Sequence, residues 1–129
     1  MKSYISFITV TVVVILSFTK TIHAQDFYIH ENGVTIVCDA AEVGDTWDYL
    51  GVTYTKRQNS SSGSSNFLNK LNFETSCTSG ITNMEGQIYG TDFSGDISHW
   101  DVSSVTNMKQ MFYQETSFNG DISNWDVSN

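Results

Sequence analysis

Residues 93–104 read Phe-Ser-Gly-Asp-Ile-Ser-His-Trp-Asp-Val-Ser-Ser, and residues 118–129 read Phe-Asn-Gly-Asp-Ile-Ser-Asn-Trp-Asp-Val-Ser-Asn. The two stretches lie 25 positions apart, are identical at nine of twelve positions, and differ only between polar residues. A fixed period of about 20–50 residues is typical of repeat proteins, in which each unit packs on the next. This repeat therefore takes priority over local propensity in predicting the fold.

The connector between the two copies is residues 105–117, and its residues 105–114 have the spacing of a short helix. Met108, Met111 and Phe112 follow one another at i, i+3 and i+4, which places them on one helix face. An earlier connector, residues 81–92, is one residue shorter and has Ile88 in place of an aromatic residue. It reads as a degenerate, capping repeat.

The stretches that follow Gly95 and Gly120 begin with turn residues and read as short strands. One helix and one strand per 25 residues is the layout of a leucine-rich-repeat-type solenoid. We therefore predict an α/β solenoid of short parallel strands and short helices, preceded by a small β cap.

The predicted core of the repeats consists of apolar residues that would stack as inward-facing ladders, together with those of the connector. These residues are Phe93, Ile97, Trp100, Val102, Val105, Met108, Met111, Phe112, Phe118, Ile122, Trp125 and Val127. For Trp100 and Trp125 the alternative is an exposed aromatic residue that binds a partner.

Residues 1–24 have the pattern of a signal peptide, with Lys2 before an apolar run and Ala24 at a plausible cleavage site. As a helix the apolar run, residues 5–18, would span about 21 Å, short of the roughly 30 Å hydrocarbon core of a bilayer. We predict that the segment is removed and that the protein is extracellular or at the cell surface. The alternative is a retained signal anchor.

The remaining chain divides into three parts. They are a small N-terminal β unit (25–57), a Ser-rich linker with the segment that leads into the repeats (58–77), and about two repeats (78–129). In the β unit a Glu-Asn-Gly turn at residues 31–33 separates two β-prone runs, and residues 51–55 offer a third strand. In the linker, Asn59 begins a glycosylation triplet that matters only in a eukaryotic secretory pathway.

The chain is acidic, with a formal net charge of −8 at pH 7. Residues 25–129 carry four basic against fourteen acidic residues, a balance of −10. Such a surface repels nucleic acid and anionic membranes. We therefore predict no nucleic-acid partner and no membrane contact beyond the export signal.

Cys38 and Cys77 are the only cysteines, and export would place them in an oxidising environment. A bridge between them would close a loop of about 40 residues, worth roughly 4 kcal/mol in the chain-entropy description. The alternative is a pair of buried, unpaired thiols. Neither residue has a second Cys or His at ligand spacing, so we predict no metal site there.

Two pairs of acidic residues recur with the repeat. If the strands stack, Asp96 would lie over Asp121 and Asp101 over Asp126 at about 4.7–4.9 Å. Stacked carboxylates repel unless a cation or a donor lies between them, so calcium between the turns is one option. The favoured alternative is that each Asp caps a turn by accepting backbone hydrogen bonds, with no cofactor.

The repeat at 118–129, together with the connector at 105–112, resembles the repeat of BspA-type leucine-rich-repeat surface proteins of bacteria. Residues 28–38 and 77–84 resemble the region that precedes those repeats. The resemblance covers most of the chain after residue 24. It implies an exported surface protein, with adhesion or host and matrix binding in some relatives, and it carries over no catalytic residue.

We predict a secreted or surface-exposed, non-enzymatic module for adhesion or protein binding, with a protein or glycan at the cell surface as its partner. The candidate exposed binding positions are His99, Asn119 and Asn124. The alternative is a structural spacer that carries another domain. An enzyme is not expected, because His30 and His99 have no Cys, Ser or acidic partner at a familiar spacing.

Arrays need about three or more repeats to bury a continuous core, so the pattern also predicts a fragment of a longer array. The final copy would leave Phe118, Ile122, Trp125 and Val127 at an uncapped end. Self-association through that end is expected.

Overall fold

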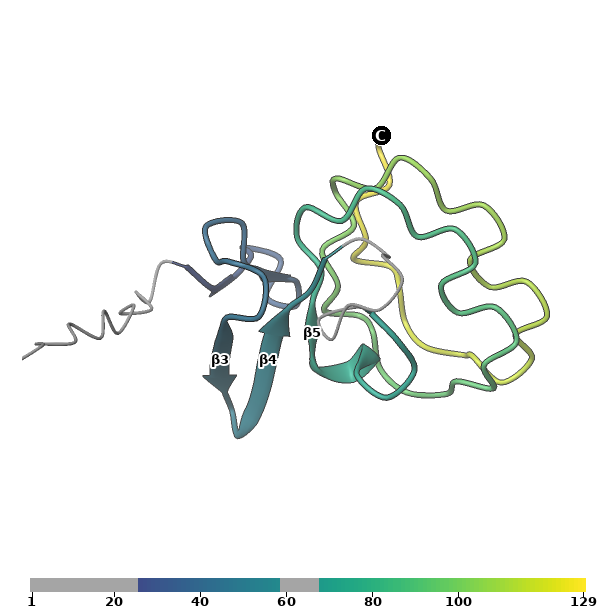
Figure 1. The fold of residues 1–129 in the computed structure, drawn as a ribbon, viewed down its shortest axis with the longest axis horizontal. Coiled ribbons are helices and arrows are strands. Elements are labelled where there is room, and N and C mark those ends of the chain that lie inside the picture. The colour runs from purple at the N-terminus through teal and green to yellow at the C-terminus, as the bar shows by residue number, and fades with distance from the viewer. Residues whose placement is uncertain (1–25, 59–67) are drawn as a thin grey trace, which may run out of the picture.

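The structure is a computed structural model and describes residues 26–58 and 68–129. The predicted signal peptide and nearly all of the predicted Ser-rich linker lie outside these residues. Figure 1 shows strands at one end of the molecule and, beside them, the green and yellow coils of the repeat region.

Five short strands and one 3₁₀ helix are the regular elements of the described residues. They are β1 (Tyr28–Ile29), β2 (Ile36–Val37), β3 (Thr46–Tyr49), β4 (Val52–Lys56), η1 (Phe73–Thr75) and β5 (Ser76–Cys77). β1 and β2 form an antiparallel two-stranded sheet. In the second sheet β4 lies in the middle, antiparallel to β3 and parallel to β5.

The turn of each hairpin has a local cause, a side-chain hydrogen bond in the first hairpin and positive φ angles in the second. In the first hairpin, the Asn32 side-chain oxygen accepts the N–H groups of Val34 and Thr35, both at 3.0 Å. In the second, Leu50 and Gly51 both have positive φ, 50° and 83°, as the tight turns that match strand twist require. The strand expected at residues 51–55 therefore pairs with β3, which the sequence analysis did not predict.

The prediction of an α/β solenoid is wrong. The regular elements of the structure are short strands in two small sheets, all between residues 28 and 77, and no α-helix occurs among the described residues. Residues 78–129 contain turns and one isolated parallel bridge, between Asn83 and Asn107.

The expected helix at 105–114 is absent because the backbone turns left-handed twice within it. Gln110 and Gln114 have φ of 55° and 57°, which ends a right-handed helix. The N–H of Met111 donates to the carbonyl of Met108 (3.1 Å), and the N–H of Tyr113 to that of Gln110 (3.0 Å). Successive turns of this kind produce the same three-residue spacing of apolar side chains as a helix.

The expected strands after Gly95 and Gly120 are also turns. The N–H of Trp100 donates to the carbonyl of Ile97, and the N–H of Trp125 to that of Ile122, each at 3.1 Å. These local hydrogen bonds compete with the formation of a strand ladder.

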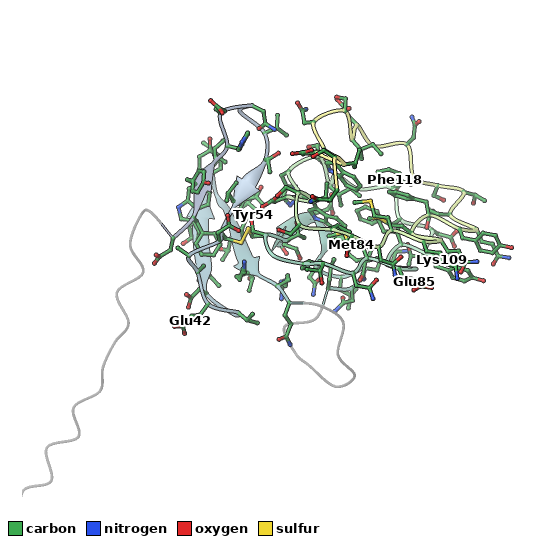
Figure 2. All side chains as sticks on the ribbon, turned by 90° about the horizontal axis from the view of Figure 1, so that it is seen from above. Glu42, Tyr54, Met84, Glu85, Lys109 and Phe118 are labelled. Carbon is green, nitrogen blue, oxygen red and sulfur yellow. A yellow bond between two sulfur atoms is a disulfide. The ribbon has the colours of Figure 1, made fainter. Side chains whose placement is uncertain are left out.

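Two coils nevertheless lie side by side; we define the first coil as residues 81–104 and the second coil as residues 105–129. The N–H groups of Met84, Gly86, Ile88 and Gly90 donate to carbonyls of the second coil at 2.8–3.1 Å. The rings of Trp100 and Trp125 stack with 6.1 Å between centroids and 3° between planes. At the edge of the coils Lys109 lies 3.9 Å from Glu85 (Figure 2).

The main hydrophobic core lies within the coils. Of the predicted core residues, Phe93, Ile97, Trp100, Val102, Val105 and Met111 are buried, and Met108, Phe112, Phe118 and Trp125 pack against them partly buried. Ile122 and Val127 are 37% and 63% exposed, because the second coil has no described neighbour on its outer side. The core also contains Leu68 and Phe73, which precede the repeats, and Ile81, Met84 and Ile88 of the first coil.

Candidate functional site

A buried disulfide joins the end of the first hairpin to β5, the strand that leads into the coils. Cys38 and Cys77 are bonded at 2.05 Å, and both are fully buried. The buried Lys56 ammonium donates to the carbonyls of Cys38 (3.0 Å) and Ser79 (2.5 Å). Burial lowers the pKa of Lys56, while Asp39 and Asp101 oppose the shift.

Backbone and side-chain hydrogen bonds continue this junction into the first coil. The N–H of Ile36 donates to the carbonyl of His99 at 2.9 Å. The Asp101 carboxylate accepts the Ser79 hydroxyl at 2.6 Å and the Ser103 N–H at 3.1 Å. These hydrogen bonds fix the position of the hairpin relative to the first coil.

A groove of about 210 Å³ lies between this hairpin and the coils, and we refer to it as the junction groove. Its lining is mostly polar and comes from β1, β2, the turn between them and both coils. The lining residues are Tyr28, His30, Asn32, Thr35, Val37, Asp39, Trp100, Asp101, Val102, Ser103, Asn124 and Asp126.

The junction groove is lined by several carboxylates and by one imidazole, that of His30. Asp39 and Asp126 lie on its wall together with the buried Asp101. Hydrogen bonds from the Ser128 hydroxyl and N–H lower the pKa of Asp126, and the nearby His30 adds to the shift. The groove therefore presents carboxylate and amide acceptors to a ligand.

The three predicted exposed binding positions lie in different surroundings. Asn124 is half-buried and lines both the junction groove and a second groove of about 730 Å³. Asn119 is exposed and lines only the second groove, together with Asp96 and Asp121. The assignment of His99 as an exposed position is wrong, because its side chain is buried under Tyr54 with 5.2 Å between ring centroids.

The repeated aspartates serve as turn caps. Asp96, Asp121 and Asp126 accept the N–H groups of the serines two residues further on, at 2.8–3.1 Å. Those hydrogen bonds lower the pKa of Asp96 and of Asp121. Among the described residues no group of three or more His, Cys, Asp or Glu side chains is placed to hold a metal ion.

Comparison with known families gives a match to the repeat region and part of the second sheet. Residues 46–129 match a family described as "Mycoplasma protein of unknown function, DUF285". The chain belongs to the DUF285 family. No curated protein and no solved structure matches it.

The DUF285 region contains only one wall of the junction groove. It starts at β3 and includes both coils, whereas Tyr28, His30, Asn32 and Asp39 precede it. Asn124 was predicted as a binding position because it lies in the repeat, whereas these four residues were not predicted. A hairpin motif by itself gives no signal that its outer face closes a groove.

In the part of the chain that the structure describes, no helix is long and apolar enough to cross a membrane.

We expect the buried His99 to make the stability of this DUF285 protein sensitive to mild acid. Its Nε2 donates to the carbonyl of Ser76 at 3.1 Å. Burial lowers the pKa of His99 below 6.5, and the Ser76 carbonyl, Asp96 and Glu74 only partly oppose this. Because the unfolded chain then binds the proton more readily, stability falls as the pH drops through 6.5 towards the folded-state pKa.

The variant His99→Asn introduces the residue found at the equivalent position 124, and it is expected to lose the pH-dependent part of the stability that His99 contributes. Urea unfolding at pH 7.5 and pH 5.5 measures this part. The free energy of unfolding of the native chain should fall more between the two pH values than that of the variant. Equal losses would show that His99 does not contribute.

Proposed function

We propose that this DUF285 protein is an exported, non-enzymatic binding module that holds a saccharide in the junction groove. The observation that carries the proposal is the groove itself, a polar recess between the first hairpin and the coils. A buried disulfide joins the end of that hairpin to β5. Binding sites favour such boundaries between structural units. Disulfides persist in secreted proteins, which supports export and a location outside the cell.

The groove suits a neutral or amino-bearing saccharide. The carboxylates of Asp39 and Asp126 supply acceptors for hydroxyl groups, and the amide of Asn124 supplies an acceptor and a donor. The net charge of −8 disfavours anionic ligands. Tyr28 is 47% exposed at the groove and offers an aromatic ring for the apolar face of a sugar.

The likeness to BspA-type surface proteins agrees with this proposal, in which the saccharide belongs to a surface to which the protein adheres.

Surface labelling of intact cells with an impermeant reagent tests the location. Labelling of Lys109, whose side chain is 70% exposed, is the expected result. Labelling only after lysis would contradict a location outside the cell.

Tyr28→Ala tests the groove. We expect it to weaken binding of neutral or amino-bearing disaccharides, such as cellobiose and the glucosamine dimer, by about tenfold through loss of ring contact, or roughly 1.4 kcal/mol. Isothermal titration with the native chain and the variant is the measurement.

Tyr89→Ala is the matched control, since Tyr89 is also 47% exposed but lies outside the groove. It should leave binding unchanged. If neither disaccharide binds the native chain, or if both variants bind alike, the saccharide proposal is wrong.

A further inference from the structure

The junction groove adjoins the second groove of about 730 Å³ at the turn of the first hairpin. Asn124 lines both grooves. Asn32 and Thr35 line the junction groove, and Val34, which lies between them in the same turn, lines the second groove. The two grooves therefore meet at this turn and Asn124. We refer to them together as the extended groove.

The size of the extended groove favours a ligand longer than a disaccharide. The junction groove alone, at about 210 Å³, is smaller than the roughly 300–1,000 Å³ of typical ligand pockets. The second groove is lined by the turns that follow Phe93 and Phe118, whose rings stack with 6.2 Å between centroids. It therefore continues the junction groove across both coils.

Two glycines leave part of the second groove without side chains. Gly95 and Gly120 both line it. A Cβ atom at position 95 would lie 2.5 Å from the Glu74 carboxyl group, and one at position 120 would lie 2.8 Å from the Phe118 ring. Because both distances are too short for a Cβ atom, these positions require glycine. A ligand can therefore approach the backbone closely at two equivalent points of the repeat.

The charged residues that line the second groove are all acidic: Glu74, Asp96 and Asp121. The junction groove adds the carboxylates of Asp39, Asp101 and Asp126, and no Lys or Arg is among the described residues that line either groove. The Ser98 N–H lowers the pKa of Asp96, whereas the nearby charge of Asp121 opposes this shift. An ammonium group beside these two carboxylates would relieve their repulsion.

We propose that the extended groove binds a linear oligosaccharide of amino-bearing units, with part of the chain in each of the two grooves. The inference rests on the proposed function, because it assigns a length and a charge to the ligand of the same site. Tyr28 and Asp126 contact the units in the junction groove. Asp96 and Asp121 accept charge-assisted hydrogen bonds from the ammonium groups further along the chain.

Isothermal titration of the native chain with four saccharides tests length and charge. They are the glucosamine dimer and tetramer and, as their neutral counterparts, cellobiose and cellotetraose. We expect the Kd of the glucosamine tetramer to be about tenfold lower than that of the dimer, because the longer chain adds charge-assisted hydrogen bonds in the second groove. The gain from cellobiose to cellotetraose should be smaller, since neutral units lack these bonds.

Two variants keep the test decisive. Asp121→Asn removes a carboxylate of the second groove and keeps an oxygen that can accept the Ser123 N–H. It should raise the Kd of the glucosamine tetramer about fivefold and leave that of the dimer unchanged. Asp48→Asn is the matched control, because it changes the net charge equally but lies on β3 and lines neither groove. It should change neither Kd.

The outcomes separate this inference from the proposed function. A dimer that binds as tightly as the tetramer would overturn the inference and leave the saccharide proposal intact. Equal effects of the two variants on the tetramer, or equal gains by the neutral and the amino-bearing chains, would also overturn it. If none of the four saccharides binds, the proposed function is wrong and the inference fails with it.

Discussion

Replacing Cys38 and Cys77 together with serine is expected to destabilise the protein by about 4 kcal/mol, which is a large part of the roughly 5–15 kcal/mol that stabilises a typical domain. The bridge spans a sequence separation of 39 residues and includes the linker between β4 and β5. Without the bridge, the unfolded chain gains the conformational entropy of that loop. Urea unfolding of the native and the double-serine chain, both at neutral pH, measures the difference.

A reducing agent supplies the control for this result. It should lower the stability of the native chain towards that of the double-serine variant and leave the variant itself unchanged. A variant whose unfolding midpoint equals that of the oxidised native chain would show that the hairpin and coils hold together without the bridge.

Trp100→Ala is the second change with a large expected effect, a loss of about 3–5 kcal/mol. The Trp100 side chain is fully buried, its ring meets Phe73 edge-on with 5.5 Å between centroids, and its indole N–H donates to the Phe73 carbonyl at 2.9 Å. The alanine variant leaves a cavity, and the Phe73 carbonyl loses one of its two donors and keeps the backbone N–H of Ser76.

The repeat supplies a matched comparison for this variant. Trp125 occupies the equivalent position in the second coil, and its indole N–H donates to the Ile97 carbonyl at 3.2 Å, but its ring is only partly buried. Trp125→Ala should therefore cost clearly less than Trp100→Ala in thermal or urea unfolding. Equal losses would mean that the outer side of the second coil is as well covered as the inner one.

The difference in burial between these two tryptophans shows what could be predicted from the sequence alone. The 25-residue period assigns Trp100 and Trp125 to equivalent positions, and the aspartates of each copy to turns. It does not distinguish them by burial, because burial depends on which coil has a neighbour on each side.

The helix and strand predictions failed for a physical reason. Met108, Met111 and Phe112 have the spacing of a helix face, but consecutive turns of three residues produce the same spacing. The positive φ of Gln110 and Gln114 decides between the two, and glutamine has no marked preference for that conformation. His99 was misplaced in a similar way, since nothing in its local sequence shows that Tyr54 covers it.

The sequence by itself determined the repeat period, the acidic charge, the two cysteines available for pairing and the apolar residues available for a core, because these are properties of composition and spacing. Only the tertiary structure decided that the first hairpin closes a groove against Asn124 and Asp126, and that Trp100 is fully buried whereas Trp125 is only partly buried. Both depend on contacts between residues far apart in the chain, and local patterns contain no information about such contacts.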